Sequence, residues 1–152
     1  GRIYDELLPH IWKPEWRRLI EEDPRPLVER LTAFYRDYAV TVFARDQFRL
    51  FLFAGILDFE NFGTRYNTLL RKEIFPAVAR ALVAEFAPAR SRDRNAIMSA
   101  ATELAHTLHG CVFHLAMRKW VYLPPRQQEI ADLVPQKVMA FIDGARSQVM
   151  KF

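Results

Sequence analysis

Two histidines three positions apart have the clearest potential for chemistry in this sequence. His106 and His109 would share one face of a helix, with Glu103 as the only carboxylate within a turn of them. Zinc sites use three or four protein ligands, so this set is incomplete. We therefore expect no metal and no cofactor. We interpret the histidines as polar groups of a pocket or an interface, which protonation near neutral pH could modulate.

Nucleophilic catalysis finds little support in the sequence. The single cysteine, Cys111, has no base placed to activate it, and we interpret it as a small buried hydrophobe. No Ser–His–Asp arrangement, Gly-rich phosphate loop or pair of carboxylates is evident. A carboxylate-bridged metal enzyme built on a helical bundle needs several Glu-x-x-His motifs, and residues 103–106 hold the one copy. We expect no enzymatic activity.

Aromatic side chains suggest ligand binding instead. They make up 13% of the chain, 12 of them Phe, and this bulky surface must be buried in a core, a pocket or a partner. Tyr38 and Tyr66 stand out because a buried phenol needs a hydrogen-bond partner, which a ligand oxygen could supply. Ordinary core packing is the alternative for every candidate. The predicted ligand-binding residues are Phe34, Tyr38, Phe48, Phe51, Phe62, Tyr66, Met98 and Thr102.

The elements that must position these residues are helices. The 152 residues include only 5 glycines, and most prolines fit helix boundaries. The hydrophobic periodicity predicts an all-α protein of about six helices, folded as a single domain over 1–152. We expect helices over 3–21, with interruptions near Pro9 and Pro14, and over 26–43, 45–57, 59–86, 93–121 and 125–143.

A few residues predict finer features of these helices. Pro76 predicts a kink after Lys72 in the fourth helix, Asp58 is a candidate cap at its start, and Gly144 is a candidate stop for the last helix. The third helix, 45–57, is apolar nearly all round, which is typical of a helix enclosed by others.

Composition and charge narrow the class of protein. Hydrophobic residues make up 51% and charged residues 26%, and the net charge of +4 comes from charges of mixed sign rather than a basic stripe. The most apolar stretch, 48–57, is too short to span a bilayer. One cysteine permits no disulfide within the chain, which fits a reducing compartment. We expect a soluble cytoplasmic protein with no membrane contact.

The last two helices carry more apolar surface than a single chain should need. Their apolar residues cover broad arcs, so we predict a homodimer formed through both helices. Gly110 would let a partner helix approach closely, and clearance for a ligand or no role at all is the alternative. The predicted interface comprises His106, Gly110, Phe113, Met117, Ile130, Val134, Val138 and Phe141.

Three segments of the sequence resemble one protein family. They are FRLFLFAGILD at 48–58, RKEIFP at 71–76 late in the long helix, and LHGCVFH at 108–114 in the next-to-last helix. In this order, and with these helix lengths and proline positions, they resemble the C-terminal domain of TetR/AcrR-type transcriptional regulators along almost the whole chain.

The resemblance implies a sensing function. In that family a small, often lipophilic effector binds among the core helices and shifts the first helix, which changes the spacing of two DNA-reading heads. The last two helices of each subunit form a four-helix dimer interface. We therefore expect the effector-sensing, homodimerising domain of a repressor. The alternative is a helical interaction module without a ligand, such as an adaptor or a corepressor.

One part of the family pattern has no counterpart here. Members carry an N-terminal helix-turn-helix that reads DNA, and residues 1–8 could at most be its tail. We expect operator DNA to be bound only through a helix-turn-helix missing from this chain.

Overall fold

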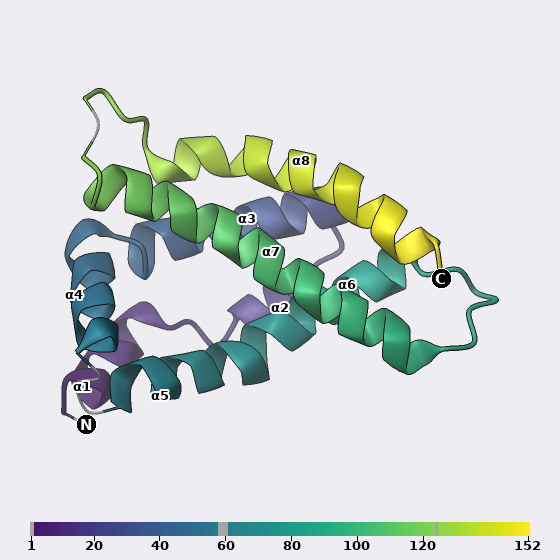
Figure 1. The fold of residues 1–152 in the computed structure, drawn as a ribbon, viewed down its shortest axis with the longest axis horizontal. Helices are drawn as coiled ribbons and strands as arrows, with labels where there is room; N and C mark the ends of the chain where they lie inside the picture. Colours follow the sequence, from purple (N-terminus) through teal and green to yellow (C-terminus); the bar gives the residue numbers. More distant parts are fainter. Residues whose placement is uncertain (1, 58–60, 124) are drawn as a thin grey trace.

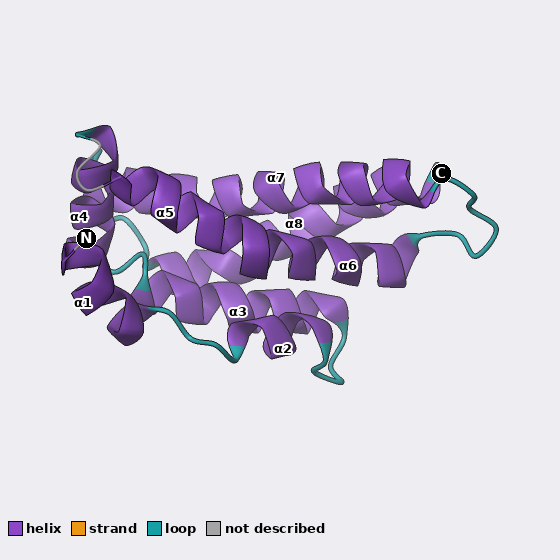
Figure 2. Cartoon of the chain, turned by 90° about the horizontal axis from the view of Figure 1, so that it is seen from below, coloured by secondary structure: helices purple, strands orange, loops and turns teal. Residues whose placement is uncertain are grey.

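The computed structural model describes the backbone of residues 2–57, 61–123 and 125–152, and the side chains of these except 2–4 and 7. Within these ranges the chain is an all-α bundle of six helical stretches with no β-strand (Figure 1, Figure 2). The predicted fold class is therefore confirmed at this level. The expected cap Asp58 and the expected first residue of the fourth helix, Phe59, lie outside the described residues.

The first four helical elements agree closely with the sequence pattern. The first stretch comprises α1 (Arg2–Ile11) and α2 (Trp16–Glu21). They are separated around Pro14 as expected, but the interruption expected near Pro9 is wrong, because Pro9 lies inside α1. The amphipathic second stretch is α3 (Leu27–Thr41), whose buried face includes Leu31, Phe34 and Tyr38 at helical spacing. The third is α4 (Arg45–Ile56).

The long fourth stretch changes its helix type shortly before Pro76, close to where the sequence predicts a kink. It consists of α5 (Phe62–Leu69), a π-helical segment (Leu70–Ile74) and α6 (Phe75–Phe86). Proline lacks an N–H and its ring clashes with the carbonyl four residues earlier. A wider π turn is one way in which a helix accommodates such a disruption.

In the last two helices, one boundary lies where the sequence predicts it and two lie elsewhere. In α7 (Arg94–Trp120) the Asp93 carboxylate accepts a hydrogen bond of 2.9 Å from the Ala96 N–H, and this cap begins the helix where the sequence predicts. By contrast, α8 (Ile130–Met150) begins five residues after Pro125 and continues past Gly144.

Both differences in α8 have local physical reasons. Leu123 and Arg126 adopt left-handed backbone angles, with φ of 50° and 61°, so the chain turns there instead of starting a helix. At the other end, Ala145 and Val149 extend the buried stripe of Phe141 by one and two turns. Their burial outweighs the cost of about 1 kcal/mol for a glycine inside a helix.

The helices pack in layers around one continuous core. The long helices α7 and α8 lie side by side, α3 packs against α8, and α6 packs against both α7 and α2 (Figure 1, Figure 2). The helix α4 stands across one end of the bundle, where it contacts α5 and α7. The core between these layers includes Trp16, Leu31, Phe34, Tyr35, Leu82, Leu108, Leu115, Val134 and Val138.

The helix α4 is not enclosed, contrary to the sequence expectation. Phe48 and Ala54 are buried, but Phe53 is 65% exposed and Ile56 is 75% exposed. Because α4 crosses the end of the bundle, only one side of it meets other helices, and its remaining apolar side chains face outward. Among the described helices, none combines the length and the apolar run that crossing a bilayer requires.

Candidate functional site

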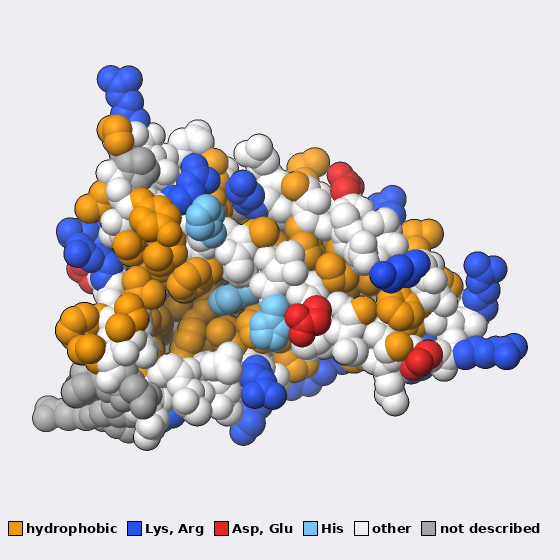
Figure 3. Space-filling view, viewed as in Figure 1, with side chains coloured by type: hydrophobic (Ala, Val, Ile, Leu, Met, Phe, Trp, Pro, Cys, Tyr) orange, Lys and Arg blue, Asp and Glu red, His pale blue; other side chains and the backbone are white. Residues whose placement is uncertain are grey.

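A cavity of about 450 Å³ lies between α4, α5 and α7. Figure 3 shows the hollow on one face of the molecule, with hydrophobic side chains inside it and histidines beside it. Its lining comes from α4 as far as the largely exposed Ile56 at its end, from one face of α5 and the π segment, and from the middle of α7. The lining residues are Phe43, Phe48, Phe51, Leu52, Gly55, Ile56, Phe62, Gly63, Tyr66, Asn67, Leu70, Phe75, His106, His109 and Phe113.

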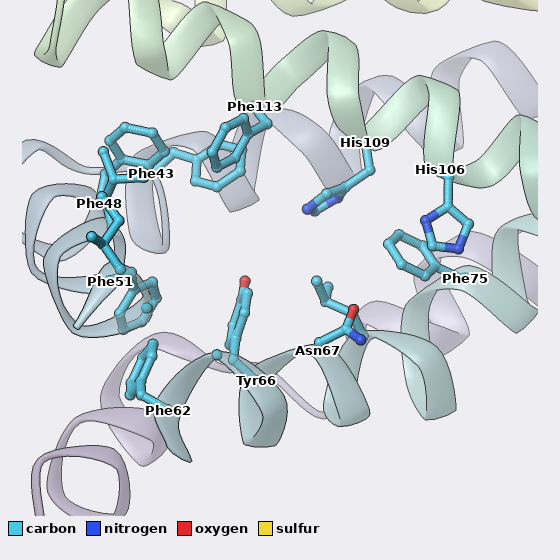
Figure 4. A pocket seen from close by; sticks show the side chains of 15 residues that line it. Phe43, Phe48, Phe51, Phe62, Tyr66, Asn67, Phe75, His106, His109 and Phe113 are labelled. Carbon is cyan, nitrogen blue, oxygen red and sulfur yellow. The ribbon is translucent and has the colours of Figure 1, made fainter. Parts of the chain in front are cut away.

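Aromatic rings form most of the cavity wall and brace one another. The ring centroids of Phe48 and Phe113 are 5.3 Å apart, which joins α4 to α7. On the α5 side, the centroids of Phe51 and Phe62 are 4.9 Å apart. Figure 4 shows these rings around the open centre of the cavity. Such contacts stabilise the wall beyond simple area burial, so the cavity is largely preformed.

Two glycines bring α4 and α5 close together at the cavity. A methyl group added to Gly63 would lie 3.8 Å from the Gly55 Cα, which is an ordinary van der Waals contact. The backbones of α4 and α5 therefore pass close to each other here, with room for little more than a methyl group between them. A methyl group on Gly55 would meet nothing within 4 Å. Gly55 therefore lines free space, and a larger residue there would project into the cavity region.

The two tyrosines singled out in the sequence are hydrogen-bonded to each other. The Tyr38 and Tyr66 hydroxyl groups pair between α3 and α5. Tyr38 is fully buried, whereas Tyr66 is partly buried and its hydroxyl points toward the cavity (Figure 4). Tyr38 thus finds its partner within the chain and needs no ligand oxygen.

His109 is the buried polar group of the cavity. Its ring is directed into the cavity (Figure 4). Its Nδ1 lies 3.2 Å from the Tyr35 hydroxyl oxygen. Burial, with a smaller contribution from nearby His106, lowers the pKa of His109 to about 4, so the imidazole is neutral at neutral pH. Burial also raises the pKa of Tyr35, which keeps its proton.

His106 occupies the exposed edge of the same cavity. Its ring packs on Phe75 with centroids 4.1 Å apart, and it does not complete a metal site with His109. Over the part of the chain that the structure describes, no group of three or more potential His, Cys, Asp or Glu ligands converges. The polar groups at hand are thus suited to hydrogen bonding with a bound molecule.

Half of the predicted ligand-binding residues line the cavity. Phe48, Phe51, Phe62 and Tyr66 do so, on the two facing helices α4 and α5. Phe34 and Tyr38 are instead fully buried in the core behind it. Met98 and Thr102 lie nearer the start of α7, outside the lining, and the Thr102 hydroxyl donates to the Met98 carbonyl at 2.8 Å.

The residues predicted for a dimer interface are mostly used within the chain. On α8, buried side chains pack against α3 and α7; they are Ile130, Val134, Val138 and Phe141. His106 and Phe113 line the cavity, and Met117 packs on the core. Gly110 is exposed with open space beside it. The α8 set cannot serve as predicted, because side chains already enclosed by their own chain offer no surface to a partner.

Several lining residues escaped the sequence prediction. Phe43 lies in the turn before α4, Leu70 begins the π segment and Phe75 begins α6, so they reach the cavity from places where a helix ends or changes type. Asn67 had one usable signal. It is a polar residue directly after Tyr66, on the helix that carries two of the predicted aromatic residues.

The cavity wall contacts the N-terminal helical stretch. Tyr66 packs edge-on against Trp12, with ring centroids 6.3 Å apart, and Trp12 packs against Trp16 at 5.4 Å. One residue before Tyr66, the Arg65 guanidinium donates to the Asp5 carboxylate of α1 at 2.8 Å. A change in the position of α5 would therefore reach α1 through direct contacts.

Comparisons with known proteins identify no relative of this chain. It matches no protein-family model, no curated protein and no solved structure.

Proposed function

We propose that this chain is a ligand-sensing domain that binds a small, largely apolar molecule in the cavity between α4, α5 and α7. The observation that carries the proposal is the aromatic lining of a hollow of about 450 Å³, to which only a few polar groups are added. This volume is within the range of ligand sites in proteins, and a mostly apolar wall with few polar groups is typical of them.

The lining also limits the charge of the ligand. None of its described residues is Asp, Glu, Lys or Arg, and His109 is neutral at neutral pH. A permanently charged group would lose water on entry and find no counter-ion there, which costs free energy. A neutral lipophilic molecule fits the cavity better.

The sensing role rests on the contacts from the cavity wall to α1. A ligand pressing on Tyr66 would act on Trp12, and the bond from Arg65 to Asp5 ties α5 to α1. In the TetR/AcrR-type regulators that the sequence resembles, the equivalent movement alters DNA binding by an attached helix-turn-helix. We extend the proposal to this role, with operator DNA bound by an attached helix-turn-helix.

We also propose the homodimer that the resemblance implies, but with its interface on other residues of α7 and α8 than those predicted from the sequence. On the outer sides of α7 and α8, Gly110 and Ala140 leave room for a close approach and Met139 is 60% exposed. The alternative function, a helical interaction module, is favoured by the exposed apolar side of α4, which includes Phe53 and Ile56.

The experiment that tests the proposed function fills the cavity. Leu in place of Gly55 would occupy cavity space, so we expect Gly55→Leu to weaken the binding of fluorene roughly tenfold or more, measured by equilibrium dialysis. The stability should not fall, because replacing a helical glycine with leucine gains up to about 1 kcal/mol.

The matched control is Gly144→Leu in α8. Gly144 also has open space beside it and lies outside the cavity lining. This variant should bind fluorene like the unmodified protein. No saturable binding of fluorene by the unmodified protein, or equal loss in both variants, would contradict the proposal.

A further inference from the structure

One ring nitrogen of His109 is left without a partner at the cavity. The side chain is 9% exposed and is directed into the hollow (Figure 4). Among the described residues, each of these two side chains makes a single hydrogen bond, which is the one between His109 Nδ1 and the Tyr35 hydroxyl. The other nitrogen, Nε2, lies at the outer end of the imidazole, where it is not sealed off by the protein and is open to the cavity.

Tyr35 determines which of the two nitrogens carries the proton. Tyr35 is fully buried, and its hydroxyl hydrogen has no acceptor in the described chain other than His109 Nδ1. If Nδ1 carried the proton, the Tyr35 O–H would be a buried donor without an acceptor, which is costly. The arrangement in which Tyr35 donates to a bare Nδ1 should therefore prevail roughly tenfold or more, with the histidine proton on Nε2.

We propose that His109 presents its Nε2–H to the cavity as a fixed hydrogen-bond donor, and that the ligand is consequently a lipophilic molecule whose polar atom is an acceptor, such as a carbonyl oxygen. This inference rests on the proposed function and adds the chemical class of the ligand. His109 is the residue that contacts the ligand, and Tyr35 is a positioning residue that acts through it.

The surroundings of His109 also favour a ligand that offers a hydrogen-bond acceptor to the Nε2–H. Its ring neighbours include Phe43, Phe75 and Tyr38, with centroids 5.9 Å, 5.4 Å and 5.4 Å from the imidazole. The two phenylalanine rings offer the Nε2–H no oxygen or nitrogen acceptor, and the Tyr38 hydroxyl is already paired with that of Tyr66. A bound apolar molecule that displaced water from the cavity would leave the donor unsatisfied, whereas a carbonyl would satisfy it.

Three rigid probes of the same shape separate the possibilities. Fluorene carries no polar group, 9-fluorenone carries an acceptor only, and carbazole carries an N–H donor only. Equilibrium dialysis gives the preference for 9-fluorenone over fluorene as the ratio of their dissociation constants. We expect this preference to be roughly fivefold greater in the unmodified protein than in His109→Leu. Carbazole should gain nothing from His109.

The possible outcomes separate this inference from the proposed function. If all three probes bind and His109→Leu leaves their ratios unchanged, the inference is wrong and the binding function stands. If His109 favours carbazole, Nε2 is an acceptor and the inference is likewise wrong. If none of the probes binds, both the inference and the proposed function are contradicted.

A spectroscopic readout in the ligand-free protein tests the tautomer and does not depend on the leucine variant folding. In nitrogen-15 spectra at pH 7, the two ring nitrogens of a neutral histidine differ strongly according to which carries the proton. We expect His109 to carry it on Nε2, and Tyr35→Phe to produce a mixture of tautomers with a reduced preference for 9-fluorenone. A proton on Nδ1 in the unmodified protein would overturn the inference.

Discussion

At the scale of single residues, the buried pair of Tyr35 and His109 gives the stability of the protein a specific pH dependence. The pKa of a histidine is near 6.5 in an unfolded chain, and in the folded protein burial lowers that of His109 to about 4. Between these two pH values the unfolded chain binds a proton that the folded chain does not. Stability from the neutral imidazole is therefore fully present above about pH 6.5 and is lost as the pH falls toward 4.

We predict that this titration is visible in urea unfolding. Lowering the pH from 7 to 4.5 should cost the unmodified protein about 2 kcal/mol that His109→Gln does not lose, because glutamine does not titrate. Parallel pH profiles for the unmodified protein and His109→Gln would show that the imidazole is not held neutral by burial.

The sequence could identify cavity residues only where the residue type itself was informative. Phe48, Phe51, Phe62 and Tyr66 were predicted as bulky aromatic residues, and they do line the cavity. Phe34 has the same type and the same helical spacing, yet it is in the core. The difference depends on which helix crosses which, and residue type and spacing do not carry that information.

At the scale of elements, helix boundaries were predictable where a side chain creates them. Asp93 caps α7 by accepting a hydrogen bond from the Ala96 N–H, and Pro76 lies two residues after the end of the π segment. The start of α8 was not predictable in this way. It depends on left-handed backbone angles at Leu123 and Arg126, residue types that rarely adopt them, so no composition signal marks the turn.

The Asp93 cap should make a measurable contribution to stability. We predict that Asp93→Ala lowers the free energy of unfolding by about 1 kcal/mol, since the Ala96 N–H at the first turn of α7 loses its acceptor. Urea denaturation would measure the loss. Asp143→Ala, at an exposed position inside α8, serves as the control and should not lower stability, because alanine is the better helix former. Equal effects of the two substitutions would mean that the cap does not stabilise α7.

At the scale of the whole molecule, the broad apolar faces of the last two helices have mostly intramolecular explanations. The sequence prediction treated these faces as surplus, but α3 covers one side of α8 and the cavity accounts for part of α7. A sequence shows how much of a helix surface must be buried. Only the packing shows whether that surface is buried by other helices of the same chain or by a partner. The surplus apolar surface is instead found on α4, at Phe53 and Ile56.

The proposed homodimer predicts different effects for two substitutions that each add a charge to the surface. In sedimentation at micromolar concentrations, we expect a dimer that Met139→Lys dissociates, because a lysine there would bring a charge into the contact between α7 and α8 of the two subunits. Phe53→Lys on α4 should leave the dimer intact. The reverse pattern would assign the interface to α4, and a monomer throughout would exclude the dimer.

We propose above all that a lipophilic molecule enters the cavity between α4, α5 and α7. The most direct measurement is a set of nuclear Overhauser contacts between bound fluorene and the labelled leucine methyl groups of the protein. We predict contacts to Leu52 and Leu70, which line the cavity from two helices, and none to Leu31 or Leu115 in the core. Saturable binding without contacts to Leu52 and Leu70 would place the ligand elsewhere and contradict the account.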